Sequence, residues 1–246
     1  MIAIVTAAYN CSPFIYATYE SLRRQTLQHW EWIVVDDHST DGTFEALEGF
    51  AAEDDRVRVL RNDRNQGAAF SRNRAMDEAR GTFLAFIDSD DLWLPEKLAT
   101  QVDFMSTGID FSFTGYQIVN EDGSPTSKRT DVSYQGRFGY EDMLAKKATL
   151  GCSTVMLRRS AIGDLRMPML KSGQDYAYWL SLLRSGIQAH LLPEVLTSYR
   201  IRKNSLSRNK LRKARQQWRI YRNLEKLSLL SSIRYFLTYA VRALIR

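Results

Sequence analysis

The chain has 246 residues, of which 44% are hydrophobic, so it can bury a sizeable core as one large α/β domain or one domain and a half. Its two cysteines, Cys11 and Cys152, lie far apart without a metal-ligand spacing, which argues against a disulfide framework and favours a reducing compartment. The net charge of +6 is unevenly spread, because residues 200–246 hold fourteen Lys or Arg against one acid, Glu225, while the preceding body is acidic.

The hydrophobic residues form short runs. None of these runs approaches the roughly 18 apolar residues that predict a membrane-spanning helix. The first run, residues 2–8, lacks a basic leader, so it predicts a strand rather than a signal peptide. We therefore expect a cytoplasmic protein.

Strand and helix patterns alternate up to about residue 60. Strands are predicted over residues 2–8, 30–35 and 56–60. We expect Ser12 to cap a helix over about residues 13–25, and the Ser39-Thr40 pair to cap the next helix. This β-α-β-α-β order is typical of a nucleotide-binding half-sheet.

The apolar run 81–87 ends in three carboxylates, Asp88, Asp90 and Asp91. The run predicts a strand that is buried on both faces in the middle of a parallel sheet. A second acidic pair, Asp36-Asp37, ends the strand predicted over 30–35. Ligands of open α/β sheets bind outside the carboxyl ends of the strands, and paired carboxylates suit Mg²⁺ held with substrate phosphates, so the two acidic ends indicate a site. The alternative is a polar turn that caps the next helix.

Gly67 opens a helix of small residues that carries Arg72 toward the same edge. An arginine there could hold a diphosphate or brace the carboxylates. The alternative is that Arg72 lies on a solvated face of the helix. Beyond the acids, Pro95 stands in the first turn of a further predicted helix.

The second half contains strand patterns at 111–116 and 151–157, with a turn at 120–125 and an amphipathic stretch from about 139 to 147. An aromatic helix then begins near Asp175. Taken alone, this acid is most simply a first-turn residue that interacts with the helix dipole.

Two helices are predicted beyond about residue 207. The second carries an apolar stripe that includes Ile233, Phe236, Leu237 and Val241, and the first carries Trp218 and Tyr221 with many basic residues. Both stripes could simply pack on the body. Alternatively, the basic and apolar faces together could bind an anionic membrane surface.

Four motifs of the chain occur in the order and spacing found in family 2 glycosyltransferases. They are Ala7-Ala8-Tyr9-Asn10, residues 33–41 with Asp36-Asp37, Asn65-Gln66-Gly67 with Arg72-Asn73, and residues 86–91 with Pro95-Glu96-Lys97-Leu98. Over residues 1–205 the chain resembles the bacterial members of this family that build teichuronic acid, capsule and O-antigen. The resemblance implies the α/β GT-A fold: a single nucleotide-binding sandwich with a central, mostly parallel sheet. Residues 1–95 would form its nucleotide-sugar half, 96–205 its acceptor half, and 206–246 basic amphipathic C-terminal helices.

The resemblance also implies residue roles. Asp37 would hydrogen-bond the uracil ring, and Asp175 would be the catalytic base, although Gln174 replaces the usual Glu beside it. The implied donor-binding residues are Ala7, Tyr9, Asp37, Asn65, Gly67, Arg72, Asp88 and Ser89. The implied ligands of a divalent metal, Mn²⁺ or Mg²⁺, are Asp88, Asp90 and Asp91. Arg202 stands where relatives often carry His, and it could still neutralise a diphosphate.

The expected activity is the inverting transfer of a sugar from a nucleotide donor, UDP-linked, to a glycan acceptor on a lipid diphosphate at the inner face of a bacterial membrane. A nucleotidyltransferase would also use paired Asp, but the sequence shows no Gly-rich, Lys/Arg-bearing N-terminal loop to hold a triphosphate. A non-enzymatic module would use the basic tail to bind a membrane or nucleic acid. The confinement of the net positive charge to the tail, away from the acidic segments, argues against that alternative, and we expect no nucleic-acid partner.

Overall fold

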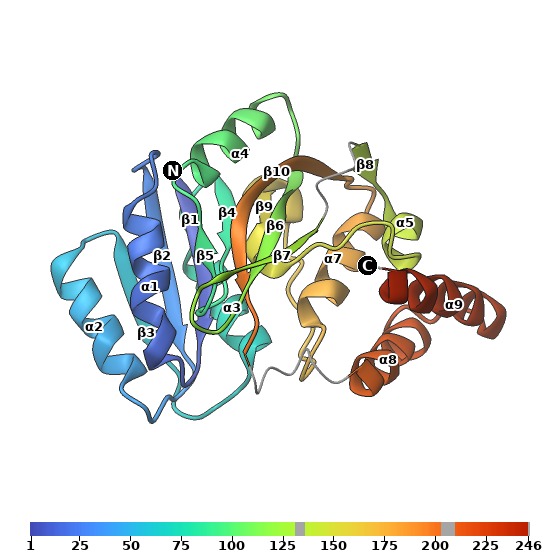
Figure 1. Cartoon of the computed structure of the whole chain (residues 1–246), viewed down its shortest axis with the longest axis horizontal. Helices are drawn as coiled ribbons and strands as arrows, with labels where there is room; N and C mark the ends of the chain where they lie inside the picture. The colour runs from blue at the N-terminus through green and yellow to red at the C-terminus, as the bar shows by residue number, and fades with distance from the viewer. Residues whose placement is uncertain (131–135, 203–209, 246) are drawn as a thin grey trace.

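The computed structural model describes residues 1–130, 136–202 and 210–245, with side chains in the last range described from 213 to 242. The predicted domain boundary at 205/206 lies outside the described residues. The described residues form one ten-stranded sheet with helices on both faces (Figure 1). This sheet runs through both predicted halves of residues 1–205.

The half-sheet predicted from the first strand patterns is confirmed. Its parallel strands lie in the order β3-β2-β1-β4, and helices connect them in the expected alternation. The strands are β1 (Ile2–Ala8), β2 (Trp30–Asp36), β3 (Val57–Arg61) and β4 (Phe83–Phe86). The helices are α1 (Ser12–Arg23), α2 (Thr43–Glu53) and α3 (Ala68–Glu78).

The second half extends the same sheet in the order β9-β6-β10-β5, with β7 on β6 and β8 on β10. The remaining strands are β5 (Leu92–Trp93), β6 (Phe111–Val119), β7 (Pro125–Thr130), β8 (Gly136–Phe138), β9 (Val155–Arg158) and β10 (Ala189–Arg200). The remaining helices of the body are α4 (Lys97–Ser106), α5 (Tyr140–Leu144), a 3₁₀ turn η1 (Cys152–Thr154), α6 (Arg159–Ile162) and α7 (Gln174–Arg184).

Alternate residues of the central strands belong to two separate cores. Ile2 and Ile4 of β1 pack with α1, α2 and α4 on one face, whereas Ala3 and Val5 pack with α3 and α7 on the other. Because successive side chains of a strand point to opposite faces, a strand covered on both sides is apolar throughout. This arrangement explains the uninterrupted apolar runs that the sequence shows.

The prediction that the acid-bearing strand lies within a parallel sheet is only half right. β4 pairs parallel with β1 but antiparallel with β9. Because β9 runs antiparallel to β4, the first residues of β9 lie beside the last residues of β4. The turn η1, which precedes β9, therefore lies next to the acids that follow β4. The prediction of a strand from 151 is corrected accordingly, because residues Cys152–Thr154 form this turn and the strand starts at Val155.

Two predicted helix caps are wrong. α1 begins at Ser12 itself, and α2 begins at Thr43 after Gly42, whose φ of 88° is left-handed. The polar residues instead tie the two turns together: the Asn10 N–H donates to Ser39 Oγ (3.0 Å) and the Thr40 N–H to Asn10 Oδ1 (2.9 Å). These contacts join the loops after β1 and β2, next to the acidic edge.

The C-terminal segment packs on the body through its first half. α8 (Lys210–Arg219) continues into a π-helical segment η3 (Ile220–Leu224), and α9 (Leu229–Ile245) follows. Tyr221 is buried and donates to the Leu144 carbonyl (2.5 Å). Glu225 accepts from Tyr140 Oη (2.6 Å) and Arg184 Nη1 (2.8 Å).

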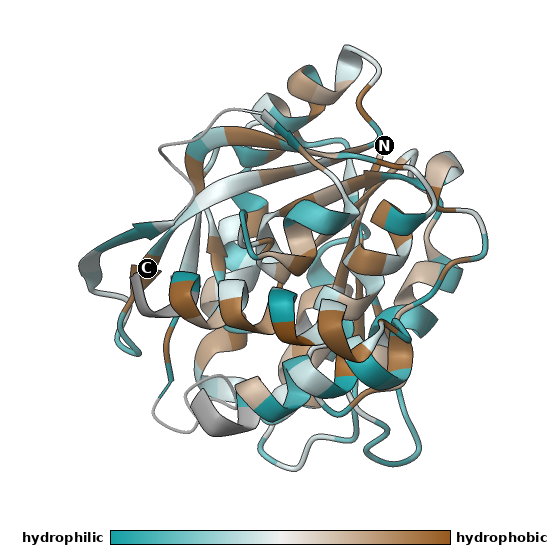
Figure 2. Ribbon diagram, turned by 90° about the vertical axis from the view of Figure 1, so that its right-hand side faces the viewer, coloured by the Kyte–Doolittle hydropathy of each residue, from teal (hydrophilic) through white to brown (hydrophobic). Residues whose placement is uncertain are grey.

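Hydrophobic segments recur along α9 (Figure 2). None of the helices in the described ranges is long and apolar enough to cross a membrane.

The close approach of the α3–β4 connection to β1 gives a test of the fold. A Cβ added at Gly81 would lie 2.5 Å from the backbone nitrogen of Ala3, so either the connection or β1 would have to shift. We expect Gly81→Ala to lower the free energy of unfolding by about 1–3 kcal/mol, as overpacking does. Urea denaturation measures this loss.

Gly49→Ala is the matched control. Gly49 lies within α2, where an added Cβ meets nothing within 4 Å among the described residues. Replacing a helical glycine with alanine should stabilise the protein by roughly 0.5–1 kcal/mol. Equal effects of the two substitutions would contradict the packing described for Gly81.

Candidate active site

The carboxyl ends of β1, β2 and β4 meet at one edge of the sheet, and both acidic segments follow strands that end there. The Asp37 N–H donates to the Ala8 carbonyl (2.8 Å), and the Ile87 N–H donates to the Val5 carbonyl (3.2 Å). β1 therefore separates the Asp37 segment from the Asp88 segment. The edge has two ends, one near Asp37 and one near Asp88.

At the first end, Asp37 fixes the loop that leads into α3. Its Oδ1 accepts from Asn62 Nδ2 (2.7 Å) and the Gln66 N–H (2.9 Å), and its Oδ2 accepts from the Gly67 N–H (2.7 Å). Gly67 has a φ of 90°, a conformation that favours glycine. A carboxylate offers about four lone-pair sites, and three of those of Asp37, which is 2% exposed, are engaged within the protein.

The other residues predicted at this end lie nearer the surface. Tyr9 and Asn65 are exposed, and Ala7 and Gly67 are partly buried. All four belong to the loops or strand ends that Asp37 and Ala8 connect. The structure therefore brings the predicted nucleoside-binding residues to one end of the edge.

Arg72 lies at the second end and is only 6% exposed. Its Nη2 donates to Asp88 Oδ1 (2.5 Å), while its Nε and Nη1 are buried without a hydrogen-bond partner among the described residues. Burial alone would lower the pKa of Arg72, but nearby acidic groups, among them Asp88 and Asp175, raise it. Arg72 therefore stays charged and has two N–H groups available for an anion.

Ser153, in the turn η1, holds the acidic segment in place. Its hydroxyl accepts from the Asp88 N–H (2.9 Å) and donates to Asp91 Oδ2 (2.5 Å). The Arg200 N–H, at the end of β10, donates to Asp91 Oδ1 (2.9 Å). Both oxygens of Asp91 are thus engaged, and the residue is 1% exposed.

Asp88 and Asp90 present the remaining carboxylate oxygens of this segment. Asp90 Oδ2 pairs with Arg202 Nη1 (3.3 Å), whereas Asp88 Oδ2 and Asp90 Oδ1 have no hydrogen-bond partner among the described residues. Burial raises the pKa of Asp90, and the charge of Asp88 raises it further. Burial and both neighbouring carboxylates raise the pKa of Asp91 well above its usual range. A bound cation would relieve this repulsion.

The described residues contain no group of three or more His, Cys, Asp or Glu side chains that converge as metal ligands. Two carboxylates completed by substrate phosphates are nevertheless a common way to hold Mg²⁺, and the open oxygens of Asp88 and Asp90 fit that pattern. Ser89, predicted with the donor-binding residues, is 8% exposed and lies beside the Cys11 thiol.

Asp175 lies in the first turn of α7, directly after Gln174 and the left-handed Gly173 (φ 68°). Burial raises its pKa, and Arg72 acts in the opposite direction. The charge of Asp88 also raises the pKa of Asp175. The predicted base is therefore near enough to Arg72 and Asp88 for their charges to shift its pKa.

Three residues of this region escaped the sequence prediction as site residues: Ser153, Arg200 and Lys213 of α8. Ser153 and Arg200 hydrogen-bond Asp91, which is more than sixty residues away from each of them in the sequence. The charge of Asp175 raises the pKa of Lys213. The contacts of Ser153 and Arg200 depend on which strands pair, and that of Lys213 on where α8 packs; no local sequence pattern reveals either.

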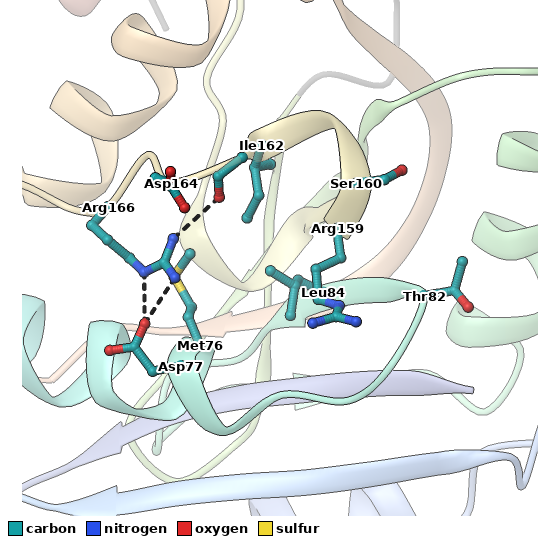
Figure 3. A pocket seen from close by; sticks show the side chains of 10 residues that line it. Met76, Asp77, Thr82, Leu84, Arg159, Ser160, Ile162, Asp164 and Arg166 are labelled. Atoms are coloured by element: carbon teal, nitrogen blue, oxygen red, sulfur yellow. Dashed lines mark hydrogen bonds and ion pairs between the residues drawn. The ribbon is translucent and has the colours of Figure 1, made fainter.

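A cavity of about 520 Å³ lies elsewhere, at the amino end of β4 (Figure 3). Thr82, Leu84 and Arg159 line it, and Arg166 pairs with Asp77 (2.8 Å) at its side. Since the acids follow the carboxyl end of β4, this cavity is distinct from the candidate site.

A half-sheet of this order, with an arginine and carboxylates gathered at its carboxyl edge, has the architecture of enzymes that bind nucleotides. Comparison of the sequence identifies the class more closely. The profile described as Glycosyl transferase family 2 matches residues 3–166, and the chain belongs to this family. It is a glycosyltransferase with the GT-A fold, as the motifs predicted.

Individual relatives agree with this assignment. The chain is 39% identical to the putative teichuronic acid biosynthesis glycosyltransferase TuaG of Bacillus subtilis, over 99% of this chain and 96% of that one. It is 36% identical to the Escherichia coli UDP-Glc:alpha-D-GlcNAc-diphosphoundecaprenol beta-1,3-glucosyltransferase WfaP, over 91% and 86%. The mannosyltransferase PcManGT of Pyrobaculum calidifontis, solved with GDP-Man and Mn²⁺, shares the fold with a TM-score of 0.71 at 18% identity, over 96% and 69%.

The mutual repulsion of the carboxylates predicts a gain in stability from removing one of them. We expect Asp90→Asn to raise the free energy of unfolding of the ligand-free protein at neutral pH. The raised pKa means that the native state binds more protons than the unfolded chain above the usual Asp range, so wild type loses stability as pH rises there. The advantage of the variant should therefore grow from pH 4.5 to pH 7.5, as measured by urea denaturation.

Asp91→Ala is the contrasting variant on the same turn. It leaves the Ser153 hydroxyl and the Arg200 N–H without their acceptor in a buried place. Each such loss costs about 1–3 kcal/mol, so this variant should be clearly destabilised. Similar stability of the two variants would contradict the different roles of the two carboxylates.

Proposed function

We propose that the enzyme transfers a sugar from a UDP-linked donor to a hydroxyl of a glycan carried on a lipid diphosphate, with inversion at the anomeric carbon. The observation that carries this proposal is the position of Arg72. It has two buried N–H groups without partners among the described residues, and the charges of Asp88 and Asp175 both raise its pKa. A diphosphate bound there would place the leaving group beside Asp88 and the acceptor beside Asp175.

The donor would lie along the carboxyl edge of the sheet. The remaining lone pair of Asp37 would accept the N3–H of uracil, with Ala7, Tyr9, Asn65 and Gly67 around the base. Arg72 would donate to the diphosphate through Nε and Nη1, and Ser89 would lie beneath it. WfaP, which uses UDP-Glc by its name, supports the choice of UDP.

Asp88 and Asp90 would hold a divalent metal together with the diphosphate. The metal would supply positive charge to the departing phosphates. PcManGT, solved with Mn²⁺, supports this assignment for the fold. We assign Asp91 to positioning the turn rather than to the metal, because Ser153 and Arg200 already engage both of its oxygens. Arg202 would stay with Asp90 and offset its charge.

Asp175 would act as the general base. It would take the proton of the acceptor hydroxyl while that oxygen forms its bond to the anomeric carbon. The bond from that carbon to the diphosphate would break on the opposite face, and a single displacement of this kind inverts the configuration. The raised pKa of Asp175 brings the group closer to neutral pH, where a base works best.

The acceptor assignment is supported by WfaP, whose name specifies a diphosphoundecaprenol-linked GlcNAc. TuaG, named for teichuronic acid biosynthesis, supports a role in a cell-surface polysaccharide. An acceptor of this kind lies at a membrane, and we propose that the enzyme binds the inner face of the cytoplasmic membrane.

Asp175→Asn separates binding from chemistry. It keeps the size of the side chain but removes its basicity, so kcat should fall on the order of 10²-fold or more. Affinity for UDP in Mn²⁺, measured by thermal shift, should persist. In wild type, kcat/KM should fall with decreasing pH at a higher pH than an ordinary aspartate would give, because burial raises the pKa.

Asp103→Asn, on the exposed side of α4, is the matched control and should leave kcat unchanged. A near-normal kcat for Asp175→Asn would show that the base lies elsewhere. Failure of the wild-type protein to transfer sugar from any UDP-linked donor would overturn the donor assignment.

The membrane proposal comes from α9. Four of its apolar residues are exposed and share one face: Leu230 is 81% exposed, Ile233 42%, Leu237 60% and Val241 54%. The predicted stripe is thus divided, because Phe236 packs edge-on against Trp218, with ring centroids 5.5 Å apart. Beyond Glu225, which is paired within the body, the sequence has no acid. An exposed apolar face in a basic segment suits an anionic bilayer.

Liposome co-sedimentation tests this surface. The wild-type chain should pellet with anionic vesicles, and less at high salt, because the Lys and Arg side chains of the segment attract the lipid. The double substitution Ile233→Gln and Leu237→Gln should abolish most of the binding. Tyr16→Gln, which removes an exposed aromatic ring from α1, should not. No pelleting of wild type at low salt would contradict the proposal.

A further inference from the structure

The helix α8 is fixed against the loop that precedes the catalytic base. Gln216 Nε2 donates to the Ser172 carbonyl (2.7 Å). A Cβ at Gly173 would lie 3.3 Å from Ile220 Cδ1 and 3.5 Å from Gln216 Cγ, so α8 and η3 lie directly on Gly173. Gly173 is two residues before Asp175. The C-terminal segment therefore forms a wall next to the base.

Lys213 lies on the same side of α8 as Gln216, one helical turn earlier. The Lys213 side chain is exposed; its closeness to the body lowers its pKa, and the charge of Asp175 acts in the opposite direction. No carboxylate lies within ion-pairing distance of Lys213 among the described residues. Its ammonium group is therefore available to an anion that approaches the base from the side of the tail.

Two cations, Arg72 and Lys213, lie near enough to Asp175 for the charges to influence one another. Arg72 lies toward the acidic edge and is already paired with Asp88. Lys213 comes from the C-terminal segment, which continues through η3 into the exposed apolar face of α9. The donor diphosphate has Arg72 and the Asp88 turn to hold it. An anion near Lys213 would therefore belong to the acceptor.

We propose that Lys213 binds the diphosphate of the lipid-linked acceptor and so holds the acceptor hydroxyl at Asp175. This inference rests on the proposed function, since the acceptor must carry a diphosphate. A lysine ammonium is a compact charge that suits phosphate oxygens. Lys213 is thus a specificity residue for the acceptor rather than a catalytic one.

The test compares two soluble acceptors, so that no bilayer contributes. One is GlcNAc on a short prenyl diphosphate, and the other is GlcNAc on a neutral alkyl group. Lys213→Gln should raise KM for the diphosphate acceptor about tenfold, the value of one hydrogen bond to a charged group. Its kcat, and its KM for the neutral acceptor, should stay within about twofold of wild type, and Lys213→Arg should restore most of the affinity.

Arg215→Gln removes the same charge from a position about 200° further around the helix and should change neither KM. An equal rise in KM for both acceptors, or no rise for either, would overturn the role of Lys213.

A binding measurement keeps this test separate from the proposed function. Geranyl diphosphate, added to the enzyme with saturating UDP and Mn²⁺, should raise the melting temperature of wild type and of Arg215→Gln. Lys213→Gln should lose that rise while retaining the shift caused by UDP alone. If the wild-type enzyme transfers no sugar but this pattern holds, the transfer assignment fails and the anion site stands. Equal shifts for all three proteins would overturn the anion site.

Discussion

The hydrogen bonds to Asp91 connect the parts of the fold that build the site. Through Ser153 they tie the end of β4 to the turn before β9, and through the Arg200 N–H they tie it to the end of β10. These segments are far apart in the sequence, yet the positions of Asp88 and Asp90 depend on all of them. The buried carboxylate of Asp91 thus fixes the turn that carries Asp88 and Asp90. Holding these acids together is electrostatically unfavourable, because burial and like charge raise the pKa of both Asp90 and Asp91.

That cost has a functional counterpart. Carboxylates that repel one another lie beside an arginine whose buried N–H groups have no partner in the described part of the chain, so the site is incomplete without ligands. A nucleoside diphosphate and a divalent cation would satisfy both at once, since phosphate oxygens meet the arginine and the cation meets the acids. Binding of these ligands would raise the free energy of unfolding, which the repulsion lowers in the ligand-free protein.

The sequence was sufficient for features that follow from local patterns and from family motifs. Apolar runs predicted the strands of the half-sheet, and the motifs predicted the family and the GT-A fold. The antiparallel pairing of β9 with β4 could not be predicted, because periodicity shows that a strand is buried but not which strand lies beside it. Ser153 was missed for that reason. The caps failed because Ser39 and Thr40 bind the neighbouring loop instead of the helix that follows them.

The tail shows how one amphipathic pattern can serve two surfaces. Periodicity grouped Phe236 with Ile233 and Leu237, but the first packs on Trp218 and the others remain exposed. Packing on the body and binding a membrane are therefore compatible rather than alternative roles. α8 and η3 are held by Gln216, Tyr221 and Glu225, so α9 has a fixed place relative to Asp175. Under the proposed function, a rigid link of this kind would let α9 on the membrane determine where a lipid-linked acceptor meets Asp175.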